Sequence, residues 1–397
     1  MEPRRITLVS ETYFPQINGV SRTLDRLVRH LRQRGDEVQL LIPRYDEPSD
    51  VPDDGVQIRS FAGLRFPLYR EILLPFARRA SLEKQLQEFA PDLVHIATEG
   101  PLGLAALRAA RRLGIPVVSS YHTNFSYYLS KYRLSLLSGL CWRYLRWFHN
   151  ATGATFCPTP SIRRILEQRG FSSVQIWSRG VDVGRFSPEL RDRSLRLQLG
   201  IRPEEKVLLY VGRLAAEKNL ETLLAAWNSL PDGHGSRLLL VGDGPLRETM
   251  QRRCDERVIF AGYRQGEELA RIYALADLFV FPSLSETFGN VMLEAMASGV
   301  PTLAFRAPGP QDVVRHESTG VLVDELTADA FGRALHDLLG NELALRRMGK
   351  QGREFALMQD WQQINDGVRR VYQNQLNGAR EPDPALNAGG VPRCRVH

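Results

Sequence analysis

Two glutamates stand eight positions apart in the stretch "SETFGNVMLEAMASGVP". Glu286 comes before a Phe-Gly-Asn turn and Glu294 comes after it. The preceding run "LFVF" predicts a buried strand, and Asn290 is a residue type that caps helices, here one over residues 291–298. If Glu286 lies in the loop, the two carboxylates can reach different parts of one long ligand. The alternative is that both acids only complement the helix dipole and that Glu294 faces solvent.

Two cations form a second candidate group, in the stretch "YVGRLAAEKNL". Arg213 closes a predicted strand, and Lys218 follows five residues later near a predicted helix start. A guanidinium and an ammonium at such an edge can clamp a diphosphate, and the amides of a helix N-terminus add partial positive charge. By themselves, the two residues are better explained as ordinary solvated cations.

The elements that would position these residues follow one plan, which occurs twice. The segments 5–43 and 206–245 each run from strand to amphipathic helix to strand. The apolar helix faces are formed by Leu24, Leu27, Val28 and Leu31 in the first segment and by Leu220, Leu223, Leu224 and Trp227 in the second. Each segment is the β-α-β opening of a doubly wound parallel sheet. We therefore expect an α/β protein with two Rossmann-like domains that face each other across a cleft.

Further strands and the domain limits fit this plan. Five more strands are predicted at "DLVHIAT", "PVVSSYHT", "RVIFAG", "DLFVFPS" and "PTLAF". The boundary is expected near "IWSRGVDVGRFSPEL", which gives domains over residues 1–180 and 181–360. A helix at about residues 360–376 is expected to complete the first domain. The tail 381–397 has no apolar periodicity and is expected to be disordered.

Several common cofactor sites are absent from the sequence. "VSETYFPQINGV" lacks the G-x-G-x-x-G spacing of dinucleotide-binding proteins, and no P-loop occurs. No two aspartates are spaced i, i+2 as in metal-dependent sugar transferases, and the 4 cysteines have no metal-ligand spacing. We expect no cofactor and no metal, so that protein cations neutralise any phosphate.

Charge is distributed unevenly along the 397 residues. Residues 1–190 carry 26 Lys and Arg against 18 Asp and Glu, whereas the remainder carries 26 against 27. The basic first half predicts contact with an anionic surface, either acidic lipid headgroups or nucleic acid. The chain has no run of about 18 apolar residues and begins without the apolar stretch of a secretory signal, so we expect a cytoplasmic location.

Taken together, the motifs resemble family 4 of the retaining glycosyltransferases, whose two-domain architecture is called GT-B. The resemblance extends to about residue 375 and rests on "ETYFPQINGVSRTL", "SSYHTNF", "RGVDVGRFSP", "YVGRLAAEKNL", "LLLVGDGP" and "PSLSETFGNVMLEAMASGVP", in that order. Glu286 and Glu294 match the family's E-x7-E motif. The resemblance implies an acceptor-binding first domain and a second domain that binds a nucleotide sugar.

The resemblance also implies a role for each site residue. Glu286 would contact the donor sugar and Glu294 the ribose, while Arg213 and Lys218 would bind the diphosphate and stabilise it as it leaves. Backbone amides for sugar and phosphate would come from Phe288, Gly289, Asn290 and Val291. Gly19, in Asn-Gly-Val where many relatives have Gly-Gly-Val, would face the diphosphate from the first domain. "FAGYR", with Gly262 and Tyr263, would border the nucleobase, and His122 would lie beside the donor sugar.

The finer pattern is similar to the branch of GDP-mannose-dependent α-mannosyltransferases and sulfoquinovosyl diacylglycerol synthases. It implies a retaining, metal-independent hexosyltransferase that uses GDP-mannose and a lipid or glycolipid acceptor, with nucleic acid excluded as a partner. A UDP-sugar donor used with diacylglycerol or a soluble glycan is the alternative. The donor's base and sugar, the acceptor, the linkage and the oligomeric state are left open. Three alternatives come from other classes: a sugar-nucleotide epimerase, a phosphorylase and a noncatalytic polyanion-binding protein. The phosphorylase would need a pyridoxal-binding lysine, and none of the 5 lysines is in such a motif.

Two basic and aromatic stretches predict peripheral binding at the inner face of an anionic membrane. They are "GLRFPLYREILLPFARRAS" and "SKYRLSLLSGLCWRYLRWF". Segments that mix arginines with Phe, Leu, Tyr and Trp suit a membrane interface. The alternative for each is a packed helix whose arginines extend to solvent.

Overall fold

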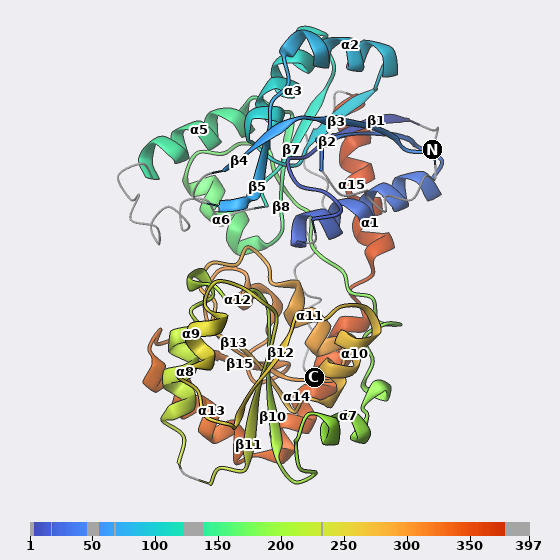
Figure 1. Ribbon diagram of the computed structural model, residues 1–397. Helices are drawn as coiled ribbons and strands as arrows, with labels where there is room; N and C mark the ends of the chain where they lie inside the picture. The colour runs from blue at the N-terminus through green and yellow to red at the C-terminus, as the bar shows by residue number, and fades with distance from the viewer. Residues whose placement is uncertain are drawn as a thin grey trace. The chain divides into compact units, whose positions relative to one another are not determined.

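The chain forms two compact units, each built on its own parallel sheet (Figure 1). The computed structural model describes residues 4–16, 18–45, 55–66, 69–122, 138–231 and 233–377. Unit 1 contains the described residues up to Arg179 together with those from Trp361 onward, and unit 2 contains Gly180–Asp360. The tail 381–397, for which disorder was predicted, lies outside the described residues.

Unit 1 contains a seven-stranded parallel sheet. The strands lie in the order β3 (Gln57–Phe61), β2 (Glu37–Pro43), β1 (Arg5–Val9), β6 (Leu93–Ile96), β7 (Val117–Ser120), β8 (Ala154–Cys157) and β9 (Val174–Ile176). The first three strands therefore run outward from β1 to one edge, and the chain then returns to the centre at β6. This reversal is the switch point of a doubly wound sheet, as the sequence predicted.

Helices cover both faces of the unit 1 sheet. On one face, α1 (Gly19–Gln33) and α15 (Trp361–Leu376) share a core with alternate side chains of β1 and β2. On the other face, α2 (Arg79–Phe89), α3 (Pro101–Arg112) and part of α5 (Ser138–Asn150) pack against the intervening side chains. α6 (Pro160–Gln168) lies against the end of the sheet at β9. The four apolar residues predicted for the first helix are all buried in α1.

The last helix of the chain packs on the first sheet, and Figure 1 shows α15 in red among the blue elements of unit 1. Arg369 of α15 donates two hydrogen bonds to the Asp36 carboxylate, at 2.7 and 2.8 Å, and both side chains are buried. Asn365 accepts a hydrogen bond from the indole of Trp177 at 3.2 Å. Specific buried polar contacts therefore hold α15 to unit 1.

Unit 2 repeats the architecture with six parallel strands. Their order is β12 (Val258–Gly262), β11 (Ser236–Val241), β10 (Lys206–Val211), β13 (Leu278–Phe281), β14 (Thr302–Phe305) and β15 (Gly320–Val323). One face is covered by α8 (Leu220–Asn228) and α13 (Ala328–Leu339). The other is covered by α10 (Gly266–Leu275) and α11 (Asn290–Ala297), and α14 (Glu342–Leu357) contributes to both cores. The five further strands predicted from the sequence are present as β6, β7, β12, β13 and β14.

The first of the two stretches predicted to lie at a membrane is a β-hairpin followed by a helix. β4 (Gly63–Phe66) pairs antiparallel with β5 (Tyr69–Pro75), and α2 follows. Pro75 is the last residue of β5, and a proline disfavours a helix interior because it lacks the amide hydrogen that the helix needs. The second stretch falls partly outside the described residues, and its described part is α5.

Candidate functional site

The predicted cations and the first glutamate lie at the switch point of the unit 2 sheet. Arg213 follows β10 and Glu286 lies in the loop after β13, and these two strands are neighbours in the sheet. From β10 the chain builds β11 and β12 toward one edge, then crosses to β13 and the opposite edge. In open parallel sheets, ligands bind beyond the carboxyl ends of the strands at this point.

Lys218 and Glu286 form an ion pair across these two loops. Their side chains are 18% and 20% exposed, so the pair is largely screened from bulk water yet remains accessible to a ligand. Nearby backbone contacts hold the loops together, because Asn219 donates to the carbonyl of Pro282 at 3.1 Å and Ser285 donates to that of Glu217 at 3.1 Å. The ammonium has three donors, so it can hold Glu286 and a phosphate oxygen at once.

Arg213 lies on the same loop as Lys218. Its guanidinium is 3.9 Å from the buried Glu217 carboxylate, and its carbonyl accepts a hydrogen bond from the Tyr210 hydroxyl at 3.0 Å. The adjacent loop after β11 approaches closely, since a Cβ added to Gly242 would lie 1.9 Å from the carbonyl oxygen of Gly212. Gly242, the first glycine in "LLLVGDGP", is thus required because the backbone of the two loops packs closely beside Arg213.

The helix after Glu286 begins one residue earlier than predicted. α11 runs from Asn290 to Ala297, so Asn290 is its first residue and is not its cap. Gly289 is the N-cap, with a φ of 90° that favours glycine, and no side chain caps the first turn. Phe288 is buried in the core and fixes the loop, while Val291 is partly buried in the first turn. The uncapped amides at this end are donors for an anion or a sugar oxygen.

Glu294 does not face solvent, which corrects the alternative considered for it from the sequence. Its side chain lies on α11 and is only 9% exposed. The hydroxyl of Tyr273 on α10 donates to its carboxylate at 2.9 Å. A carboxylate placed in a core needs such partners because burial without hydrogen bonds is costly. The position therefore has a specific polar role rather than a general effect on the helix dipole.

Gly262 and Tyr263 lie at the end of β12, the edge strand of unit 2. Gly262 has a φ of 71°, and Tyr263 is half exposed. One strand, β11, lies between β12 and β10, the strand that Arg213 follows. Their predicted place beside a nucleobase stays a prediction.

Gly19 and His122 belong to unit 1. Gly19 is the exposed first residue of α1, and Asn18 caps this helix by accepting from the amides of Val20 and Ser21 at 3.0 and 2.9 Å. Asn18 thus has a structural use as the cap of this helix. His122 follows β7 and is partly buried, with its Nδ1 3.0 Å from the guanidinium of Arg179.

Sequence reasoning missed two acids at the switch point of unit 1, between β1 and β6. The Glu11 carboxylate accepts hydrogen bonds from the amides of Leu102 and Gly103 at the start of α3, at 2.8 and 3.3 Å. Burial raises the pKa of Glu11 to about 7, against the effect of these amides and with a smaller contribution from Glu99. The buried Glu99 lies 3.9 Å from His149. Both acids come two or three residues after a strand, and this position was the available signal.

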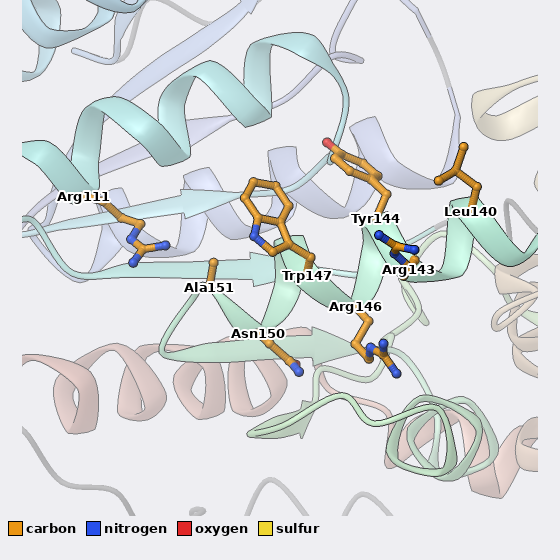
Figure 2. Close-up of a pocket in the computed structure, with 8 residues that line it drawn as sticks. All are labelled: Arg111, Leu140, Arg143, Tyr144, Arg146, Trp147, Asn150 and Ala151. Carbon is orange, nitrogen blue, oxygen red and sulfur yellow. The ribbon is translucent and has the colours of Figure 1, made fainter.

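A hollow of about 720 Å³ lies on unit 1 beside α5 (Figure 2). Figure 2 shows arginine, tryptophan and tyrosine side chains around it, most of them on α5. The lining residues are Arg111, Leu140, Arg143, Tyr144, Arg146, Trp147, Asn150 and Ala151. Elsewhere in the described residues, no group of His, Cys, Asp and Glu is arranged to hold a metal ion, and no helix is long and apolar enough to cross a bilayer.

Comparison with known families identifies both units. Residues 17–185 match the model of Glycosyltransferase Family 4, and residues 192–355 match that of Glycosyl transferases group 1. A GDP-mannose-dependent alpha-mannosyltransferase of Mycolicibacterium smegmatis is 35% identical over 379 residues, which are 94% of this chain and 98% of that protein. The chain belongs to glycosyltransferase family 4. It is therefore a glycosyltransferase, and the alternatives from other classes fall away.

Two further relatives have names that refer to other sugars. The sulfoquinovosyl transferase SQD2 of Arabidopsis thaliana is 32% identical over 377 residues, 93% of this chain and 73% of that protein. The alpha-monoglucosyldiacylglycerol synthase of Streptococcus pneumoniae is 30% identical over 386 residues, 89% of this chain and 85% of that protein. Members similar to this glycosyltransferase thus differ in the sugar they transfer.

The GT-B fold is confirmed by solved structures. The Anabaena protein HepE, in complex with UDP and glucose, superposes with a TM-score of 0.75 at 19% identity, covering 93% of this chain and 99% of that one. At this identity the likeness concerns the fold alone. The two parallel sheets predicted from the sequence are the two halves of this fold.

Proposed function

We propose that this family 4 member is a retaining, metal-independent hexosyltransferase that takes the hexose from GDP-mannose. The acceptor is a lipid or glycolipid at the inner face of the cell membrane. The observation that carries the proposal is the Lys218–Glu286 pair at the switch point of unit 2, with Arg213 on the same loop. The 35% identity to a GDP-mannose-dependent enzyme over nearly the whole chain favours this donor.

The residues of unit 2 suit the departure of a diphosphate. As the bond between the anomeric carbon and the phosphate oxygen breaks, negative charge develops on the leaving group. Arg213 and Lys218, held by Tyr210 and Glu286, provide preorganised positive charge at this place. The acceptor hydroxyl attacks the anomeric carbon from the face that the diphosphate leaves, and its proton passes to a phosphate oxygen. Because attack and departure occur on the same face, the anomeric configuration is retained.

The two glutamates have separate tasks in this proposal. Glu286 accepts hydrogen bonds from the hydroxyls of the hexose, and the amides at the start of α11 contact sugar and phosphate. Glu294, oriented by Tyr273, accepts from the ribose hydroxyls of the nucleotide. Because a carboxylate has two acceptor oxygens, it suits a vicinal diol.

The membrane surface in this proposal is the outer face of α5 with the end of α3. Neither helix contains an acidic residue, and together they carry 5 arginines. Leu140 and Trp147 are 65% and 47% exposed on α5. Within the described residues, Arg111, Arg143 and Arg146 form no ion pair, whereas Arg79 and Arg163 pair with nearby glutamates. Cations without partners beside exposed apolar groups suit anionic headgroups.

A UDP-sugar donor with diacylglycerol as acceptor is the second candidate. The observation in its favour is the similarity to the monoglucosyldiacylglycerol synthase and to the sulfoquinovosyl transferase. These relatives match nearly the whole chain, as the mannosyltransferase does.

One panel of reactions tests both candidates. Purified protein is incubated with GDP-mannose, UDP-glucose, UDP-sulfoquinovose or UDP-glucuronate and with liposomes containing diacylglycerol, glucuronosyl diacylglycerol or phosphatidylinositol, and products are read by mass spectrometry. We expect an α-linked glycolipid from GDP-mannose in the presence of EDTA. Glu286→Gln should abolish it, while the exposed control Glu325→Gln should not. A product from a UDP-sugar alone would replace the first candidate by the second, and strict dependence on a divalent ion would refute metal independence.

A further inference from the structure

Arg179 is a buried cation with neutral partners. Its side chain is 5% exposed and lies just after β9, at the end of unit 1. One guanidinium nitrogen, Nη1, donates to the carbonyls of Trp177 and Ser178, and the group lies over the Trp177 ring at 5.0 Å. Among the described residues no carboxylate forms an ion pair with it. Burial lowers the pKa of Arg179 to about 9, so it remains a cation at neutral pH.

The other terminal guanidinium nitrogen, Nη2, lies 3.0 Å from Nδ1 of His122. A guanidinium has only donors, so Nδ1 must be the acceptor of this hydrogen bond. A neutral imidazole that accepts at Nδ1 carries its proton on Nε2. The ring is held in this orientation by the edge of Trp177, whose centroid is 5.6 Å away.

The groups around His122 also keep it uncharged. Burial is the main cause that holds its pKa well below the usual value, followed by the charge of Arg179 and the rings of His95 and His149. His95 lies on β6 and bonds Tyr372 of α15 and Ser120 of β7, and His149 lies on α5 and contacts Ser119.

We infer that Arg179 is a positioning residue that makes His122 a fixed hydrogen-bond donor through Nε2. The group that meets Nε2 must then be an acceptor, and on the proposed function it is a hydroxyl or phosphate oxygen of the nucleotide sugar or its acceptor. The guanidinium polarises the ring, so that Nε2–H presents positive charge without a proton that pH can remove. His122 therefore does not act as a general base.

A neutral amide at position 179 would behave differently. Asparagine or glutamine can either donate to or accept from Nδ1, which allows both tautomers of the imidazole. The guanidinium permits only the tautomer that carries its proton on Nε2. The arginine thus selects the tautomer as well as the orientation of the ring.

The first experiment needs no turnover, so it is independent of the proposed function. Protein labelled with ¹⁵N-histidine is examined by long-range ¹H–¹⁵N NMR, with His122 assigned by its loss in His122→Gln. We expect a bare Nδ1 and a protonated Nε2 from about pH 6 to 8. In Arg179→Gln we expect the His122 signals to show a mixture of the two neutral tautomers, because the amide can either donate to or accept from Nδ1. A proton on Nδ1 in the native protein would overturn the inference, and so would unchanged His122 signals in a folded Arg179→Gln protein.

Turnover supplies the second readout. His122→Gln keeps a donor and should retain more kcat/KM than His122→Phe, by about tenfold, whereas a general base would be lost equally in both. Arg179→Gln should lower kcat/KM, because part of the protein then holds the wrong His122 tautomer, whereas Arg179→Lys, whose ammonium can only donate to Nδ1, should retain more of it. Equal loss in both His122 variants, or an acid limb in the native pH profile of kcat/KM at the His122 pKa, would contradict the donor assignment. If no nucleotide sugar is turned over, the proposed function fails and the NMR result still decides the inference.

Discussion

At the scale of single residues, the buried contact between Tyr273 and Glu294 gives the most direct test of the donor site. Tyr273→Phe removes the hydroxyl that orients the Glu294 carboxylate at 2.9 Å but keeps the ring in the core. If Glu294 holds the ribose, its loss of orientation weakens donor binding in the ground state and the transition state alike. We expect KM for the nucleotide sugar to rise about three- to tenfold with little change in kcat. Initial rates over a range of donor concentrations measure this.

Tyr121→Phe is a suitable control, because it removes a buried tyrosine hydroxyl from unit 1 rather than from the α10–α11 contact. It should leave KM for the donor unchanged. A fall in kcat with unchanged KM in Tyr273→Phe would show instead that Glu294 acts on the reacting sugar.

Glu11 gives a residue-scale prediction for pH. Its pKa is raised to about 7, chiefly by burial, from 4.5. Between these values the native state holds a proton that the unfolded state has released, so the stability of unit 1 falls as pH rises through this window and is constant above it. Glu11→Gln keeps an oxygen for the amides of Leu102 and Gly103 without the titration. We expect the native protein to lose up to about 3 kcal/mol relative to this variant between about pH 4.5 and 7.

Denaturation followed by tryptophan fluorescence measures this difference, since unit 1 holds 4 of the 5 tryptophans, at positions 142, 147, 177 and 361. Glu37→Gln, on an exposed carboxylate, is the control and should leave the pH dependence of the native protein in place. Parallel pH curves for native and Glu11→Gln proteins would mean that the pKa of Glu11 is the same in the folded and unfolded states.

At the scale of elements, α15 is held to unit 1 by a buried ion pair. Arg369→Ala removes both guanidinium donors from the buried carboxylate of Asp36, which keeps the backbone amide of Arg4 at 3.1 Å, and breaking a buried pair typically costs about 3–5 kcal/mol. Arg370→Ala changes the adjacent, exposed arginine of the same helix and should cost less than about 0.5 kcal/mol. Chemical denaturation of both variants measures the contrast. Similar stabilities would mean that the pair contributes nothing net and that apolar contacts hold the helix.

The sequence predicted elements better than side-chain partners. Apolar alternation and the spacing of Leu24, Leu27 and Leu31 are local signals, so both β-α-β openings could be recognised before the structure was known. The Arg179–His122 contact joins residues 57 positions apart, and no periodicity reports such a distance. The start of α11 was displaced because a left-handed glycine, Gly289, took the capping position that an asparagine side chain usually fills.

At the scale of the whole molecule, the uneven charge of the chain has a structural location. The first half carries the excess of basic residues, and α3 and α5 of unit 1 present arginines without any acid in either helix. A surface of this kind attracts anionic lipid, and the attraction weakens as salt screens it. Exposed Trp147 and Leu140 add an apolar contribution that salt does not screen. Membrane binding should therefore depend on both lipid charge and ionic strength.

The corresponding prediction concerns Arg143→Glu/Arg146→Glu, which changes the charge of the outer face of α5 by four. In co-sedimentation with vesicles, we expect the native protein to bind phosphatidylglycerol vesicles and not phosphatidylcholine vesicles. At about 1 kcal/mol for each basic residue near the surface, loss of two should weaken binding at least about tenfold, before repulsion is counted. The control Arg333→Glu/Arg346→Glu makes the same change of charge at exposed arginines of unit 2, whose side chains are 68% and 78% exposed. Because this control leaves α5 intact, equal losses in the two variants would assign binding to net charge and not to this surface.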